Sequence, residues 1–161
     1  MDISVTKCRQ NHFEILPFSL LKRKEIASKF SLTYILAPDV SKMTTQLGPK
    51  KTKRICGDGN CFFRSISYII TGTKENHSNL RKATSLHLGE MNIFARKKFL
   101  GEEPKVYLER SKMANDKVWA TEKEIFTIAS LFSGDVFVYS EHGCAILAVG
   151  ILKRYRKLLL P

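Results

Sequence analysis

The segment GDGNCFFR at residues 57–64 places one cysteine directly after two glycines, an aspartate and an asparagine. Cysteine attacks a carbonyl carbon as its thiolate, and the N-terminus of a helix stabilises a thiolate. Gly57 and Gly59 permit backbone conformations that turn N–H groups inward, where they can bind the oxyanion of acyl transfer. Cys61 is therefore a candidate nucleophile, with Gly59 and Asn60 in a candidate oxyanion loop. The alternative is a small core cysteine behind a β-turn, because Asp-Gly-Asn is common in turns.

The residues that follow Cys61 have the apolar spacing of a helix. Apolar side chains at positions 62, 63, 66, 69 and 70 share one face, and Gly72 is placed to end the helix. This spacing predicts that Cys61 lies at the first turn of a helix.

Four segments further along the chain predict three helices and a strand. The helices are expected over 79–99, capped by Ser78 or Asn79 and broken near Gly89; over 104–114, with Pro104 in the first turn; and over 121–132, with Thr121 and Glu124 as a capping box. Gly134 is expected to end the last helix. DVFVYS at 135–140 is typical of a central strand, so the order of elements indicates an α/β or α+β domain.

Residues 1–50 have weaker patterns. The segment 16–30 has some helical apolar spacing, and SLTYIL at 31–36 predicts a short strand. Residues 38–54 are polar and basic and predict a loop or linker. The KKTKR stretch at 50–54 is a solvated basic lead-in, with a localisation signal or a phosphate contact as alternatives.

Composition limits the class of protein. The 161 residues predict one domain, and 27 basic against 15 acidic residues give a net charge of +12, which suits nucleic acid or an acidic protein surface as well as simple solubility. The four cysteines show neither zinc-ligand spacing nor a disulfide framework, so we expect no metal and a reducing compartment. The apolar run 144–152 is too short to span a bilayer. We expect a soluble, cytoplasmic protein without a cofactor or membrane contact, with the nucleus as an alternative location and the oligomeric state left open.

GDGNCFFRSIS resembles the nucleophile motif D-G-N-C-L-F-R-A of the ovarian-tumour (OTU) family of cysteine proteases. Further landmarks of that family follow in order: Gly72, HSNLR at 77–81, YLERSKM at 107–113, Trp119, EIFTIASLF at 124–132 and VFVYS at 136–140. The resemblance therefore extends over residues 57–140.

This resemblance implies a fold and an activity. OTU-like domains have a small central β-sheet flanked by helices, and most members are deubiquitinases that cleave at the C-terminus of ubiquitin. It implies that Cys61 is the nucleophile, that Asp58 orders the oxyanion loop, and that ubiquitin or a ubiquitin-like protein is the partner. We expect an unassigned N-terminal extension at 1–50 and an OTU-like domain at 51–161, whose tail at 143–161 is atypical.

The histidine that should act as general base has no clear match. In the family it lies on a late strand before an aromatic residue, a context that none of the four histidines has: His12, His77, His87 and His142. His142 alone follows a predicted strand and is the remaining candidate base. We expect the strand with the catalytic histidine to be missing, as in a truncated chain. The alternatives are a non-catalytic relative that binds ubiquitin and a basic module that associates with nucleic acid.

Overall fold

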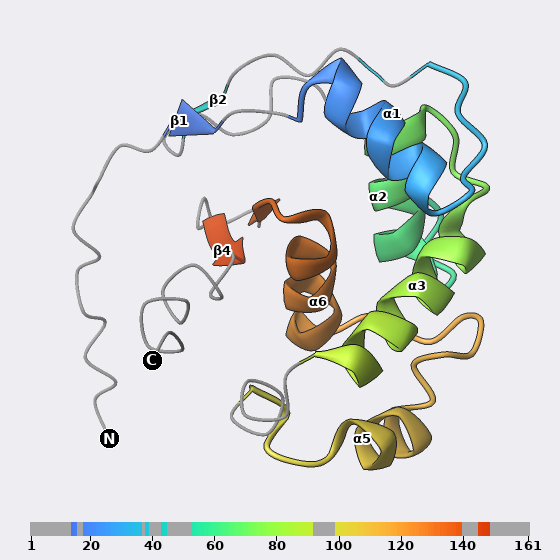
Figure 1. Cartoon of the computed structure of the whole chain (residues 1–161), viewed down its shortest axis with the longest axis vertical. Helices are drawn as coiled ribbons and strands as arrows, with labels where there is room; N and C mark the ends of the chain where they lie inside the picture. The colour runs from blue at the N-terminus through green and yellow to red at the C-terminus, as the bar shows by residue number, and fades with distance from the viewer. Residues whose placement is uncertain are drawn as a thin grey trace.

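Five helices form the bulk of the part that the computed structural model describes (Figure 1). It describes residues 18–36, 38, 53–91 and 99–136, and the backbone alone of 14–15, 43–44, 137–139 and 145–148. The helices are α1 (Leu20–Lys29), α2 (Cys61–Thr71), α3 (His77–Glu90), α5 (Pro104–Ser111) and α6 (Glu122–Phe132). None of these helices combines the length and the apolar character that crossing a membrane requires.

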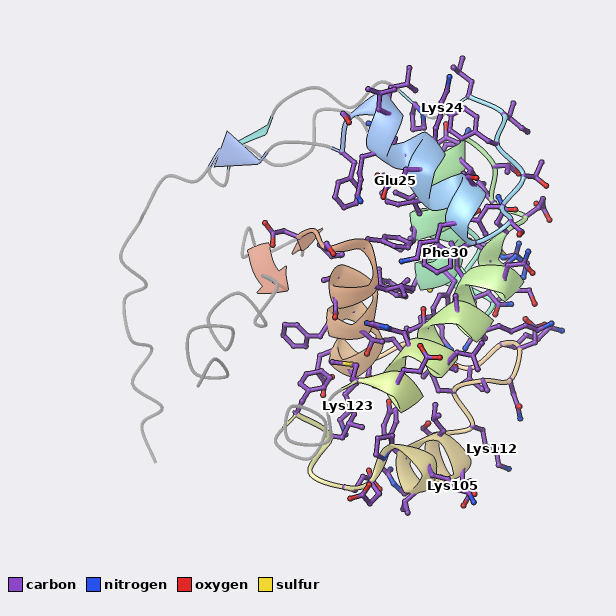
Figure 2. The ribbon with its side chains drawn as sticks, viewed as in Figure 1. Lys24, Glu25, Phe30, Lys105, Lys112 and Lys123 are labelled. Carbon is purple, nitrogen blue, oxygen red and sulfur yellow. The ribbon has the colours of Figure 1, made fainter. Side chains whose placement is uncertain are left out.

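The helix α2 packs between α1 and α3, and α3 in turn contacts α5 and α6 (Figure 1). One apolar core joins α1, α2, α3 and α6, with Phe63 and Ile128 fully buried at its centre. At the end of α1, the ring of Phe30 (Figure 2) lies 5.9 Å from that of Phe132 in α6. The helix predicted within 16–30 is thus present as α1, and it belongs to the same core as α2. The domain boundary near residue 50 stays a prediction.

Short sequence signals explain where three of the helices begin or end. Gly72 ends α2 in the left-handed conformation, with φ of 81°, as predicted. Pro104 opens α5 at its first turn. The capping box of Thr121 and Glu124 opens α6, and both of its reciprocal hydrogen bonds are present. These signals act within one turn of the chain, so the sequence is enough to find them.

The strand predicted for residues 31–36 is wrong, because this segment is a loop that begins with a turn at Ser31. The Asn76 side chain binds both backbone groups of Thr33: Oδ1 accepts from the Thr33 N–H at 2.9 Å, and Nδ2 donates to the Thr33 carbonyl at 2.9 Å. The Ile35 N–H donates to the carbonyl of Thr71 at the end of α2. A side-chain amide and a helix end therefore take the place of a neighbouring strand.

Two predicted helix ends also differ from the structure. The helix α3 begins at His77 behind Asn76, and not behind Ser78 or Asn79. It ends at Glu90, next to the break expected near Gly89. The helix α6 ends at Ser133, which takes the left-handed conformation with φ of 53°, one residue before the expected Gly134. The segment 92–98, where the second helix was expected to continue, lies outside the described residues.

Two strand pairs are described by their backbone. The strands β1 (Glu14–Ile15) and β2 (Met43–Thr44) form one antiparallel pair, and β3 (Val136–Tyr139) and β4 (Ala145–Ala148) form another, with Val136 opposite Ala148. The strand predicted at 135–140 therefore corresponds to β3. The central sheet expected of the fold stays a prediction, since each described strand has a single described partner.

A buried hydrogen bond joins α5 to α6. The Tyr107 hydroxyl donates to Oε1 of the buried Glu124 at 2.7 Å, and the other Glu124 oxygen accepts from the N–H and hydroxyl of Thr121. Burial raises the pKa of Tyr107 to about 12, and the hydrogen bond to Glu124 adds to the shift. Lys123 (Figure 2) covers this contact, with its ammonium 4.6 Å from the centre of the Tyr107 ring.

We expect Tyr107→Phe to lower the free energy of unfolding by about 1–3 kcal/mol, because the Glu124 carboxylate loses a buried donor. Tyr34→Phe is the matched control, since the Tyr34 hydroxyl is buried without a hydrogen-bond partner among the described residues. Its removal should cost little or nothing. Urea denaturation of the two variants measures both effects, and an equal loss in both would contradict the assignment.

Candidate active site

The residues GDGN form a tight turn that delivers Cys61 to the first position of α2. Asp58 Oδ1 accepts a hydrogen bond from the Asn60 N–H at 3.0 Å, which closes the turn. Gly59 takes the left-handed conformation with φ of 81°. A Cβ at Gly59 would overlap the backbone carbonyl of Lys117, whereas one at Gly57 would meet open space. Only the second of the two glycines is therefore required by the turn.

Asp58 is held by Arg64, one turn into α2. Asp58 Oδ2 accepts hydrogen bonds from Arg64 Nη2 at 3.0 Å and from Arg64 Nε at 3.2 Å. The hydrogen bond from Arg64, with the one from the Asn60 N–H, lowers the pKa of Asp58 from 3.8 to about 2. The carboxylate is thus ionised at neutral pH, and it ties the turn to the helix that follows.

Asn60 stands at the N-cap of α2, but its side chain does not cap the helix. Asn60 Oδ1 instead accepts from Arg81 Nη2 at 2.8 Å and from the Lys117 N–H at 3.0 Å. The first N–H groups of a helix have no partner within the helix, and no side-chain cap binds them in α2. The Asn60 side chain therefore leaves the backbone N–H donors at the start of α2, beside Cys61, uncapped.

Cys61 itself is a free, partly exposed cysteine. Its carbonyl accepts from the Ser65 hydroxyl at 2.7 Å, within the first turn of α2. Asp58, Gly59, Asn60 and Cys61, the four site residues predicted from one short motif, form one continuous turn and helix start. Their catalytic roles stay predictions.

The loop after α5 is the part of the site that the sequence did not reveal. It approaches the turn at Lys117, whose backbone has a left-handed φ of 63°. Trp119, one of the family landmarks, lies two residues further on with 63% of its surface exposed. No local signal in the sequence indicates that this loop packs on the Gly59 turn, because the contact joins residues almost sixty positions apart.

The described histidines do not contact the thiol. His77 Nδ1 lies 3.3 Å from Arg64 Nη1 and 3.2 Å from the Lys74 carbonyl oxygen. His87 Nε2 lies 3.1 Å from the Ser130 hydroxyl, and burial lowers the pKa of His87. His12 and the candidate base His142 lie outside the described residues. Within the described ranges, no group of histidine, cysteine and carboxylate side chains has the arrangement of a metal site.

We expect Gly59→Ala to lower the free energy of unfolding by about 1–3 kcal/mol, because the alanine Cβ would force the turn away from Lys117. Gly57→Ala, two residues earlier in the same turn, should change it by less than about 0.5 kcal/mol. Urea denaturation gives both values. Equal losses in the two variants would show that the turn does not depend on this close approach.

We also expect a specific acid dependence from Asp58. Because the folded pKa of Asp58 is depressed, its contribution to stability is present above pH 3.8 and is lost as the pH falls toward about 2. The difference in free energy of unfolding between the wild type and Asp58→Asn should be constant near neutral pH and shrink across this window. A difference that stays constant through the window would contradict the low pKa.

Comparison with known proteins tests the resemblance independently. The sequence model of one family, described as OTU-like cysteine protease, matches residues 56–160. The match begins one residue before the Gly57 turn and continues through the tail, where the landmarks are not found. No curated protein and no solved structure matches the chain significantly. Since the family match covers well over half of the 161 residues, this chain belongs to the OTU-like cysteine protease family.

Proposed function

We propose that this protein is a cysteine peptidase that cleaves the peptide or isopeptide bond at the C-terminus of ubiquitin, with Cys61 as the nucleophile. The supporting observation is the start of α2, where a free cysteine stands behind a glycine turn and the helix has no side-chain cap. Membership of a cysteine protease family supports the reaction class. Ubiquitin as the substrate rests on the resemblance to the deubiquitinases of that family.

In the proposed reaction the Cys61 thiolate attacks the carbonyl carbon of the last ubiquitin residue. A carbon–sulfur bond forms, and the carbonyl oxygen becomes an oxyanion that backbone N–H groups at the start of α2 stabilise. The carbon–nitrogen bond then breaks, and the leaving amine takes up a proton. Water hydrolyses the resulting thioester, which releases the ubiquitin carboxylate and restores the thiol.

Asp58 has a supporting part in this proposal. Its carboxylate accepts from the Asn60 N–H on one side and from Arg64 on the other, so it holds the turn in the shape that exposes the donors. The proton on the leaving amine requires a general acid. His142 is the candidate that the sequence leaves for this role, and it lies outside the described residues.

A ubiquitin probe with an electrophile at its C-terminus tests Cys61 directly. We expect the wild type to form a covalent adduct and Cys61→Ala to form none, because the proposed reaction has a single nucleophile. Cys56→Ala is the matched control, since Cys56 is also a free cysteine and is exposed, five residues earlier. Its adduct should form at the wild-type rate. An adduct that survives in Cys61→Ala would overturn the proposal.

Turnover of a ubiquitin C-terminal reporter separates the catalytic and non-catalytic readings. Release of the reporter by the wild type, lost in Cys61→Ala, supports the peptidase. Adduct formation without turnover favours a relative that binds ubiquitin but lacks a working base. Where the wild type turns over, unchanged activity in His142→Ala would remove His142 as the base.

A further inference from the structure

The guanidinium of Arg81, on α3, lies buried directly behind the Gly59 turn. Arg81 is 2% exposed, and its Nη2 donates to the Gly59 carbonyl at 3.0 Å and to Asn60 Oδ1 at 2.8 Å. The same nitrogen lies 2.8 Å from the Val118 carbonyl, and Nη1 donates to the Met113 carbonyl at 2.9 Å. One side chain therefore joins the turn before Cys61 to both ends of the loop 113–118.

The turn and the loop 113–118 also contact each other directly, at Lys117. The Lys117 N–H donates to Asn60 Oδ1, and the Lys117 backbone lies against Gly59 so closely that no side chain fits between them. Lys117 also holds a left-handed backbone that a non-glycine residue adopts at some energetic cost. Such a conformation persists only when surrounding contacts over-determine it, and Arg81 supplies those contacts on either side of Lys117.

An arginine side chain suits these contacts with the turn and the loop better than any other cationic side chain. The acceptors of Arg81 among the described residues are backbone carbonyls, the Asn60 side-chain amide and the Met113 sulfur, so no described carboxylate pairs with it at hydrogen-bond distance. Its guanidinium carbon lies 4.5 Å from the centre of the Phe63 ring in α2. Burial lowers the pKa of Arg81, while the nearby carboxylates of Asp116, Glu124 and Asp58 act against this shift. The two terminal nitrogens of a planar guanidinium fork reach acceptors on different segments in a fixed geometry, whereas an ammonium group donates from a single nitrogen.

A buried cation without a bonded carboxylate stabilises a fold poorly, since its desolvation offsets much of what its hydrogen bonds contribute. We propose that Arg81 is a positioning residue of the active site. It fixes the Gly59–Asn60 turn against the loop 113–118 and so sets the orientation of the first backbone N–H groups of α2, beside Cys61. Its effect on catalysis rests on the proposed function, but the effect of Arg81 on the position of the turn can be tested by itself.

Arg81→Lys keeps the charge and removes the fork. We expect amide hydrogen exchange to rise by at least about tenfold in residues 58–62 and 113–118, with the buried residues of α6 unchanged. Arg23→Lys is the matched control, because Arg23 is also buried and donates to two backbone carbonyls, those of Phe18 and Pro38, neither of which belongs to the turn or the loop. It should leave both segments protected. Unchanged exchange in Arg81→Lys would overturn the inference.

A second measurement distinguishes positioning from a purely structural role. Ubiquitin aldehyde forms a reversible adduct in which the thiol adds to the aldehyde and the oxygen occupies the oxyanion site. Iodoacetamide alkylates the same sulfur by displacing iodide, without any oxyanion. We expect Arg81→Lys to weaken aldehyde binding by at least about tenfold while Cys61 alkylation, followed by mass spectrometry, keeps its rate. Equal losses in both reactions, or in neither, would contradict the proposal.

Different results would overturn the proposed peptidase function and the positioning role of Arg81. If the wild type binds no ubiquitin aldehyde, the proposed function fails, and hydrogen exchange still decides whether Arg81 holds the turn. If Arg81→Lys does not fold, Asn60→Ala removes the acceptor at the other end of the same hydrogen bond. That variant must then loosen both segments, and full protection in it would overturn the inference.

Discussion

The buried guanidinium of Arg81 binds carbonyl oxygens of residues 59, 113 and 118, and these three segments have no common secondary structure to hold them together. Each of these carbonyls lies in a turn or loop, where its hydrogen bond must come from a side chain or from water. A single planar donor satisfies them all, so the shape of the candidate active site depends on one side chain from a neighbouring helix.

The N-termini of the helices show how long-range hydrogen bonds to the backbone affect the site. Ser19 and Thr121 cap their helices locally, with side chains that accept from N–H groups of the first turn. Asn60 and Asn76 occupy the same position in α2 and α3, yet both turn their side chains to distant backbone. Asparagine is among the best capping residues, so a helix start without its cap marks a competing tertiary contact. At α2 the consequence is that the Asn60 side chain does not cap the first N–H groups beside Cys61.

The electrostatics of the turn follow the same logic. Arg64 and Arg81 both bind the Asp58–Asn60 segment, one paired with a carboxylate and the other with neutral oxygens. The Asp58 carboxylate keeps its charge at neutral pH because Arg64 and the Asn60 N–H favour the ionised form. The segment is thus held by charge-assisted hydrogen bonds from two arginines, and these limit its movement at the point where chemistry is proposed.

Much of the fold could be predicted from short-range signals. The Gly72 stop, the Pro104 start and the capping box at Thr121 all act within one helical turn, and the structure has each of them. The start of α3 and the strand expected at 31–36 were predicted wrongly for one reason. Asn76 binds the backbone of Thr33, which is 43 positions away, and no local pattern reveals such a pairing.

The sequence by itself determined the candidate nucleophile and the turn before it, because these depend on residue types within a few positions of Cys61. It also indicated the family, through motifs that follow in order over residues 57–140. The tertiary structure alone decided that Gly59 is required while Gly57 is not, that Asn60 leaves its helix uncapped, and that Arg81 is buried behind both. The reason is physical: each of these facts depends on which backbone atoms approach across the fold. The Lys117 loop is almost sixty positions from the turn in the sequence, so only the tertiary packing brings the two together.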